Sequence, residues 1–231
     1  MIARPTYIEE LKKWQNKDVI KVITGMRRCG KSTLFDLFIE ELKLQGIKDN
    51  QIIHINLEDA DYDFQDYKQL YKYINNRITL KQKYYVFLDE VQNVSEFQKA
   101  VDSLYIKKNV DVYVTGSNAY LLSGELATLL SGRYIEIKML PLSFKEYVMA
   151  FDNHDYQQLF LQYMKNGGMP GNIEILKDNP NGVDTYLDGI FSTIVYKDIM
   201  FRNNITDKML LEGVLKFIFD SIGNPISTKK I

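Results

Sequence analysis

Residues 19–32 read Val-Ile-Lys-Val-Ile-Thr-Gly-Met-Arg-Arg-Cys-Gly-Lys-Ser, and this stretch decides the fold. Its first part, Val19–Thr24, is rich in β-branched side chains and predicts a buried strand. Gly25–Ser32 then satisfies the pattern G-x-x-x-x-G-K-[ST], and apolar residues at helical spacing follow Lys31. A chance match in a glycine-containing turn is the alternative interpretation. The strand before the pattern and the helix after it favour a phosphate-binding loop.

A loop of this kind binds phosphate through its backbone N–H groups, because its glycines let the chain turn inward at the positive end of a helix dipole. Its lysine reaches the β- and γ-phosphate oxygens, and the hydroxyl after it binds Mg²⁺. The pattern therefore predicts Lys31 as a catalytic residue and Ser32 as a magnesium ligand. The predicted nucleotide-binding residues of the loop are Gly25, Met26, Arg27, Arg28, Cys29, Gly30, Lys31, Ser32 and Thr33.

Outward from the loop, strands and helices alternate. Further strands are predicted at Gln51–Asn56, Tyr84–Leu88, Val110–Thr115 and Tyr134–Leu140, and helical spacing is found at Lys31–Leu42, Leu70–Ile78, Val94–Leu104 and Leu121–Leu130. Five strands separated by helices favour a three-layer α/β fold with a parallel, doubly wound sheet. Such sheets bind their ligands at the carboxyl ends of the strands, where the phosphate-binding loop also lies.

The apolar strand Tyr84–Leu88 delivers two carboxylates at its end, Asp89 and Glu90. Alone, such a pair is more often a solvated turn, but together with the loop it predicts a Walker B segment. Asp89 would hold Mg²⁺ through water, and Glu90 would be the general base that polarises the attacking water. One more strand-helix unit, Gln51–Leu80, lies between the two motifs. That order is typical of ATPases with an extra strand between the two functional strands, and it disfavours nucleotide kinases.

Two further positions have both a functional and a structural interpretation. Ser117 and Asn118 end the fourth strand, where a polar side chain would lie beside the γ-phosphate and sense hydrolysis; the alternative is a glycine-containing turn in which Asn118 caps a helix. Arg133 precedes the last strand. One interpretation is that it enters a neighbouring subunit's site, where an arginine stabilises transition-state charge. The other is a surface arginine, which the local sequence alone favours.

The composition excludes several classes of protein. The 231 residues include 29 basic and 30 acidic side chains, so the formal charge of −1 gives nucleic-acid binding no support, although it leaves room for a local basic patch. The longest apolar runs are five residues and the N-terminus lacks a signal-peptide pattern, so we expect no membrane partner and a cytoplasmic location. Cys29 is the single cysteine and the two histidines are isolated, which disfavours disulfides, zinc sites and Cys–His nucleophile pairs.

After Pro141 every periodic segment is helical, which predicts a helical second unit from residue 142. One amphipathic helix is predicted at Leu210–Ile222, and Thr228–Ile231 has the pattern of the start of another. That last helix would stop after one turn with its apolar face uncovered. We therefore expect the chain to be a fragment of a longer protein.

Five segments in a fixed order resemble the bacterial and archaeal AAA-type ATPases that carry an uncharacterised C-terminal domain. They are Gly25–Ser32, Leu88-Asp-Glu-Val-Gln92, Thr115-Gly-Ser117, Leu130-Ser-Gly-Arg133 and Leu140-Pro-Leu-Ser-Phe-Lys-Glu-Tyr147. The resemblance spans nearly the whole chain. It implies an AAA+ P-loop ATPase core at residues 1–141, a helical lid at 142–204 and the start of a helix-turn-helix at 205–231. Relatives commonly continue into a region that resembles a restriction-endonuclease-like fold.

The resemblance also implies roles for single residues. Gly168-Met169-Pro170 matches a Gly-x-Pro lid signature, which implies that Pro170 lies beside the bound nucleotide; a helix-breaking loop is the structural alternative. It also supports Arg133 acting in a neighbouring subunit, and hence a homo-oligomer. No arginine lies between Arg133 and Arg202, so the chain departs from AAA proteins in which a lid arginine contacts the γ-phosphate.

The leading functional hypothesis is an ATP-binding protein that hydrolyses ATP with Mg²⁺ and so switches the lid and the C-terminal region between arrangements. The alternative is a slowly hydrolysing, nucleotide-regulated switch whose helix-turn-helix binds DNA or a partner protein. Phosphate transfer to a small molecule ranks last, because residues 142–201 contain no arginine for a substrate-binding lid.

Overall fold

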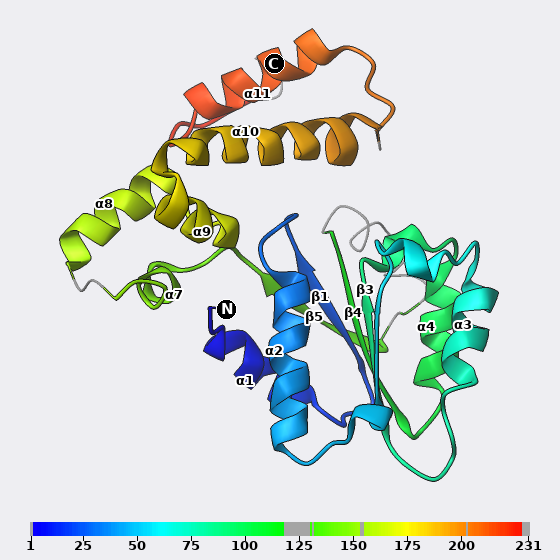
Figure 1. Ribbon diagram of the computed structural model, residues 1–231. Coiled ribbons are helices and arrows are strands. Elements are labelled where there is room, and N and C mark those ends of the chain that lie inside the picture. The colour runs from blue at the N-terminus through cyan, green and yellow to red at the C-terminus, as the bar shows by residue number, and fades with distance from the viewer. Residues whose placement is uncertain (1, 118–129, 131, 153–154, 202, 228–231) are drawn as a thin grey trace. The chain divides into compact units, whose positions relative to one another are not determined.

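Five parallel strands form one sheet in the part of the chain that the computed structural model describes, which is residues 2–117, 130, 132–152, 155–201 and 203–227 (Figure 1). The strands are β1 (Ile20–Gly25), β2 (Ile52–Asn56), β3 (Tyr84–Asp89), β4 (Val110–Ser117) and β5 (Tyr134–Met139), and they lie in the order β2-β3-β4-β1-β5. β4 thus separates the strand before the phosphate-binding loop from the strand that ends in the acidic pair. The predicted α/β fold with an extra strand between the two functional strands is confirmed.

Helices cover both faces of this sheet. The helices α1 (Pro5–Trp14) and α2 (Lys31–Leu44) lie on one face, and α3 (Tyr67–Asn75) and α4 (Phe97–Tyr105) lie on the other (Figure 1). Successive strand side chains point to opposite faces, so Phe87 packs in the core of α2 and Val86 packs in the core of α3 and α4. All six residues of β3 are therefore buried, which explains its continuous apolar run.

Helices follow the sheet, as the sequence predicts beyond Pro141. In residues 1–183, which form one compact unit, these are α7 (Phe144–Val148), α8 (Tyr156–Asn166) and α9 (Pro170–Asp178), with a small core of their own around Tyr147. Residues 184–231 form a second compact unit, with most of α10 (Val183–Thr193), a π-helical segment (Ile194–Phe201) and α11 (Lys208–Asp220). Short 3-10 helices lie at η1 (Asp49–Gln51), η2 (Ala60–Tyr62), η3 (Val91–Asn93) and η4 (Pro180–Gly182).

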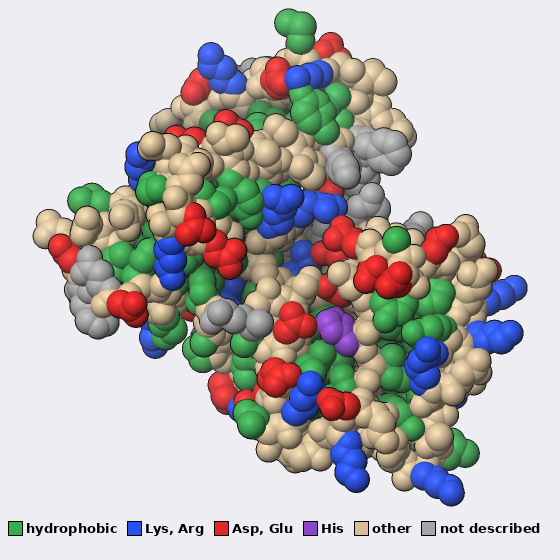
Figure 2. All heavy atoms as spheres, in the orientation of Figure 1, with side chains coloured by type: hydrophobic (Ala, Val, Ile, Leu, Met, Phe, Trp, Pro, Cys, Tyr) green, Lys and Arg blue, Asp and Glu red, His purple; other side chains and the backbone are tan. Residues whose placement is uncertain are grey.

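Some sequence-based predictions are not tested by this architecture. The expected helix at Leu121–Leu130 lies outside the described residues except for Leu130, which is buried, and the helix start at Thr228–Ile231 lies wholly outside them. The domain divisions after residues 141 and 204 stay predictions. Within the described ranges, no helix combines the length and apolar character needed to cross a membrane. On the face shown in Figure 2, Lys and Arg side chains are interspersed with Asp and Glu side chains.

A buried ion pair joins β1 and β4 near the amino-terminal edge of the sheet. Lys21 is fully buried, and its ammonium group pairs with the carboxylate of Asp111. The second oxygen of Asp111 accepts hydrogen bonds from the Tyr113 hydroxyl and the Asn16 backbone N–H, each at 2.8 Å. Burial lowers the pKa of Lys21, and the charge of Asp111 opposes that effect. The pair therefore depends on both partners.

We expect Asp111→Ala to destabilise the fold by about 3–5 kcal/mol, because it leaves the Lys21 ammonium buried without a counter-charge. Asp111→Asn should cost less, since an amide oxygen still accepts hydrogen bonds there. Glu40→Ala, which removes an exposed ion pair with Lys43, should leave the unfolding midpoint nearly unchanged. Urea unfolding followed by circular dichroism measures all three. An Asp111→Ala midpoint equal to that of the wild type would contradict the expectation.

Candidate functional site

The phosphate-binding loop turns from the end of β1 into the first turn of α2, and two of its glycines explain how. Gly30 precedes α2 with a φ of 100°, a left-handed conformation that glycine adopts without strain. Gly25 is required by close packing, because a Cβ atom there would lie 2.6 Å from the Met139 carbonyl oxygen and 2.8 Å from Cys29 Sγ. The loop is thus pressed against the end of β5, and its backbone faces the start of α2.

Cys29 is the inward-facing side chain of this loop. Its thiol is buried, and Sγ lies 3.8 Å from the Met139 carbonyl oxygen. Burial raises the pKa of the Cys29 thiol, which keeps it in the neutral, unreactive form. Cys29 therefore packs the loop against β5 and is not among the residues that line the cavity above the loop.

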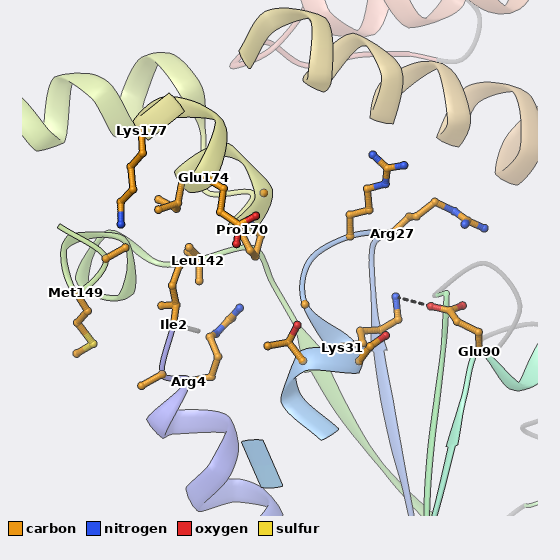
Figure 3. A pocket seen from close by; sticks show the side chains of 18 of the residues that line it. Ile2, Arg4, Arg27, Lys31, Glu90, Leu142, Met149, Pro170, Glu174 and Lys177 are labelled. Carbon is orange, nitrogen blue, oxygen red and sulfur yellow. Dashed lines mark ion pairs between the residues drawn. The ribbon is translucent and has the colours of Figure 1, made fainter. Parts of the chain in front are cut away.

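Lys31, the first residue of α2, is 4% exposed. Its Nζ lies 3.4 Å from the Gly25 carbonyl oxygen, 3.3 Å from that of Met26 and 3.3 Å from Glu90 Oε1. A buried ammonium group needs such oxygen neighbours, because it has lost its water shell. The sequence predicted Lys31 and Glu90 from two separate motifs, and the fold brings them into direct contact (Figure 3).

Asp89, the last residue of β3, is buried beside β4. The parallel register pairs Leu88 with Val114, which places Asp89 next to Thr115. The Thr115 hydroxyl donates a hydrogen bond to Asp89 Oδ1 and accepts one from the Glu90 backbone N–H at 3.0 Å. Thr115 thus orients both acidic residues. The sequence placed this threonine at the end of a strand next to the acidic pair, but only the register of the two strands identifies it as their partner.

Glu90 has a left-handed backbone, with φ of 53° and ψ of 53°. Non-glycine residues adopt this conformation rarely, and when they do it is often at functional sites. Its second carboxylate oxygen, Oε2, accepts a hydrogen bond of 2.5 Å from Gln92 Nε2. The carboxylate therefore has a donor on each oxygen, Lys31 on one side and Gln92 on the other.

A cavity of about 1020 Å³ opens above the loop, and Figure 3 shows the side chains around it. The loop contributes Arg27, Arg28, Gly30, Lys31, Ser32 and Thr33, and the far side is formed by Ile2, Leu142, Met149, Ala150, Pro170 and Ile173. Its charged lining comprises five cationic and three acidic side chains, an excess that suits an anion. One end can therefore hold phosphates, and the other offers an apolar surface.

A family model described as an AAA domain matches residues 17–148, which is more than half of the chain and includes both motifs. The chain belongs to this AAA family. An uncharacterized protein of Haemophilus influenzae is 42% identical over 240 residues, covering 100% of this chain and 58% of that protein. An uncharacterized protein of Methanocaldococcus jannaschii is 31% identical over 237 residues, covering 96% of this chain and 51% of that protein. The AAA chain thus spans little more than half the length of these curated relatives.

Among solved structures, that of Drosophila ORC bound to DNA is similar to this AAA chain with a TM-score of 0.53 and 13% identity, over 81% of this chain and 57% of that one. At this identity the likeness shows the fold alone. The expected AAA-type assignment is confirmed by the family match, so the chain contains a nucleotide-binding domain of the ATPase type. The expectation that it is part of a longer protein stays a prediction.

Pro170 lies next to the loop of the AAA domain, and its place beside a bound nucleotide stays a prediction. It begins α9, and its Cγ would be 3.7 Å from a Cβ atom placed on Gly30. The residue two positions earlier, Gly168, packs closely against Leu142. Its carbonyl oxygen accepts a 2.7 Å hydrogen bond from Leu142 N, and a Cβ atom on Gly168 would lie 2.3 Å from the Leu142 oxygen. No arginine comes from α9, but Lys177 does line the cavity. The sequence pattern around Lys177 does not indicate this position.

Arg133 is not among the residues that line this cavity, and the predicted roles of Ser117 and Asn118 stay predictions. Ser117 ends β4 with its backbone in register with Gly25, and Asn118 lies outside the described residues. Arg133 precedes β5 at the edge of the sheet where β1 begins, whereas the cavity lies where β1 ends. Its guanidinium group pairs with Asp102 of α4. A role in a neighbouring subunit and a plain surface role both stay open for Arg133.

Arg4 is a residue whose importance the sequence did not reveal. It is 3% exposed, and its guanidinium group makes three contacts with distant parts of the AAA domain. Nε lies 2.8 Å from Glu146 Oε1, Nη2 lies 2.8 Å from the Leu140 carbonyl oxygen, and Nη1 lies 3.3 Å from the Cys29 carbonyl oxygen. Arg4 therefore ties the loop to the end of β5 and to α7. Its position beside Pro5 before a helix gave no signal of these contacts.

Gly25→Ala should disrupt the loop, because the added methyl group would meet the Met139 backbone at 2.6 Å and force the strand ends apart. We expect a loss of about 1–3 kcal/mol in folding free energy, together with weaker nucleotide binding. Gly189→Ala is the matched control, since a Cβ there meets nothing within 4 Å in α10. Thermal melts and fluorescent-nucleotide titration compare the two variants. Unchanged stability and affinity in Gly25→Ala would show that the loop accommodates the methyl group.

Proposed function

We propose that this AAA domain binds ATP in the cavity above the loop and hydrolyses it with Mg²⁺, and that hydrolysis switches the lid region (residues 142–204) and the C-terminal region between arrangements. One observation carries the proposal: Lys31 Nζ and Glu90 Oε1 lie 3.3 Å apart at the lining of the same cavity. A phosphate-binding lysine and a candidate general base are thus within reach of one reacting group.

The triphosphate would lie over the start of α2. Backbone N–H groups of the loop and the dipole of this 14-residue helix favour negative charge at that end. Incoming phosphate oxygens would compete with Glu90 for Lys31, since both are anionic partners of one ammonium group. Glu90 would then be released from this ion pair while it stays at the cavity lining and keeps its hydrogen bond from Gln92.

The residues near the phosphates fit Mg²⁺. Ser32 lines the cavity with a hydroxyl, and Asp89 supplies a carboxylate at the end of β3, which β4 separates from β1. Hydroxyl and carboxylate oxygens are the hard donors that this cation prefers. When bound, the cation would neutralise charge on the β- and γ-phosphates. Thr115 serves this arrangement by fixing the orientation of Asp89.

Glu90 would orient a water molecule and accept its proton. It fits that role because it lies at the cavity lining, is mostly buried, and is held by an ion pair at one carboxylate oxygen and a hydrogen bond at the other. A general base typically contributes about 10²- to 10⁴-fold to the rate. Lys31 has to release Glu90 before the carboxylate can take a water, and phosphate binding supplies that release.

A slowly hydrolysing, nucleotide-regulated switch is the second candidate. It is favoured by the contact between Lys31 and Glu90, because a base that is paired with an ammonium group is not free to activate water. Its output would be DNA or a partner protein, bound through the C-terminal region; the solved structure with the similar fold is itself bound to DNA. Turnover of the full-length protein with and without DNA separates this candidate from a fast ATPase.

Glu90→Gln should bind ATP with unchanged affinity and lose about 10²- to 10⁴-fold in turnover, because the amide cannot accept the proton. Glu96→Gln is a matched control: Glu96 also has a left-handed backbone, with φ of 54°, but it is exposed and pairs with Lys99. Phosphate release under saturating ATP measures turnover. Hydrolysis that persists in Glu90→Gln would remove Glu90 from the mechanism.

Lys31→Ala should lose ATP binding, since it removes the buried ammonium group that would meet the β- and γ-phosphates. It also leaves Glu90 without its ion-pair partner. Isothermal titration calorimetry with ATP and Mg²⁺ compares the variant with the wild type. Full affinity in a folded Lys31→Ala protein would mean that the nucleotide lies elsewhere.

Arg133 would act in a neighbouring subunit of a homo-oligomer. To do so it must leave Asp102, with which it pairs in the single chain. We expect specific ATPase activity to rise with protein concentration, and Arg133→Ala to abolish that rise; loss of such an arginine typically costs about 10³- to 10⁵-fold. Asp102→Ala is the control, because it removes the partner and keeps the arginine. Intact turnover by assembled Arg133→Ala protein would leave Arg133 as a surface residue.

A further inference from the structure

Gln92 belongs to the short 3-10 helix η3 (Val91–Asn93), directly after the acidic pair. Its Nε2 donates a hydrogen bond of 2.5 Å to Glu90 Oε2, while Lys31 Nζ lies 3.3 Å from Oε1. The two donors come from different parts of the fold. Lys31 belongs to the phosphate-binding element, whereas Gln92 belongs to the same turn as Glu90. A phosphate can therefore remove the first donor without touching the second.

The other end of the Gln92 amide carries a second observation. Gln92 Oε1 is buried and has no hydrogen-bond partner among the residues that the structure describes. A buried acceptor without a partner is unfavourable, so a position of this kind favours a donor such as water. Reversing the amide would direct its oxygen at the Glu90 carboxylate, which would repel it, so the nitrogen has to face Glu90. The free acceptor consequently lies beside the carboxylate.

The turn that carries both side chains is fixed at several points. The Glu90 backbone N–H donates to Thr115, the Asn93 N–H donates to the Glu90 carbonyl oxygen at 3.1 Å, and Asn93 Nδ2 donates to the Leu57 carbonyl oxygen at 3.2 Å. These bonds connect the turn to β4 and to the end of β2. Gln92 and Glu90 therefore keep their relative placement when Lys31 turns to a ligand.

We propose that Gln92 is a positioning residue for the hydrolysis of ATP, an inference that rests on the proposed function. Gln92 holds Glu90 through Oε2 after Lys31 has moved to the phosphates, so the carboxylate keeps its orientation while it accepts a proton from the water. In that step the water oxygen bonds to the γ-phosphorus, and the bond from the γ-phosphorus to the bridging oxygen breaks. ADP leaves with that electron pair, and one water proton passes to Glu90 and then to solvent.

Two variants of the full chain test this role. Gln92→Ala removes both ends of the amide, and Gln92→Glu keeps the shape but replaces the donor with a carboxylate that repels Glu90. Both should lower kcat for ATP by about 10- to 100-fold, by analogy with residues that orient the ligands of a catalytic metal through a hydrogen bond. ATP affinity should stay at the wild-type value, because Gln92 does not line the cavity. Gln98→Ala, a glutamine of α4, is the control and should leave kcat unchanged.

A double-mutant cycle separates positioning from a structural role. If Gln92 acts through Glu90, adding Gln92→Ala to Glu90→Gln should lower kcat no further. Additive losses, or a fall in ATP affinity and melting temperature that matches the fall in kcat for both variants, would overturn the inference. Wild-type kcat in both variants would also overturn it, with the proposed function intact. A wild-type protein that binds ATP without turnover would overturn the proposed function first and the inference with it.

Discussion

A buried ammonium group needs oxygen atoms around it, and Lys31 imposes that requirement on the whole site. Its exposure of 4% leaves it little water, so its charge is balanced by two loop carbonyl groups and by Glu90. Those carbonyl groups can converge only because Gly25 lets the loop approach β5 closely. Glu90 can reach the lysine only because β4 holds β3 at the right distance from β1. The strand order, Gly25 and the turn that carries Glu90 are thus all needed to surround the Lys31 ammonium group with oxygen atoms.

The parts of this site that could be predicted from the sequence are those in which chemistry and local structure coincide. Gly25–Ser32 predicts a phosphate-binding loop by itself, because its glycines allow the turn, its lysine suits phosphate and its serine suits Mg²⁺ within eight residues. Asp89 and Glu90 follow an apolar strand, and parallel strands bring their carboxyl ends to one edge. The contact between Lys31 and Glu90 follows from these two facts together. The sequence pattern did not give the exact ends of the helices. For example, α3 starts at Tyr67 and not near Leu70, because the Asp66 side chain caps it by accepting hydrogen bonds from two backbone N–H groups.

The parts that could not be predicted depend on contacts between residues far apart in the chain. Arg4 and Glu146 are separated by 142 positions, and neither lies in a pattern that indicates a buried ion pair. Thr115 was visible as the end of a strand, but its two bonds to the acidic pair depend on the register of β3 with β4. Arg4 and Thr115 gain their roles from burial, which composition and spacing do not encode. Lys177 is exposed, and its place at the cavity depends on where the fold puts α9.

The charge around the cavity bears on the proposed response of residues 142–204 to a nucleotide. Lys177 and Glu174 of α9 both line the cavity, so this helix contributes one charge of each sign. A lid arginine would act as a fixed cation with a planar fork, whereas a lysine is a point charge on a flexible stem. Lys177 lies with Nζ 5.8 Å from the centre of the Phe151 ring, so it already has a favourable place without phosphate. In the proposed lid region, Lys177 would therefore gain less from a γ-phosphate than an unpaired arginine would. The stronger link between the loop and the helices that follow the sheet is therefore Arg4, whose guanidinium group contacts the Cys29 carbonyl oxygen and the Glu146 carboxylate at once.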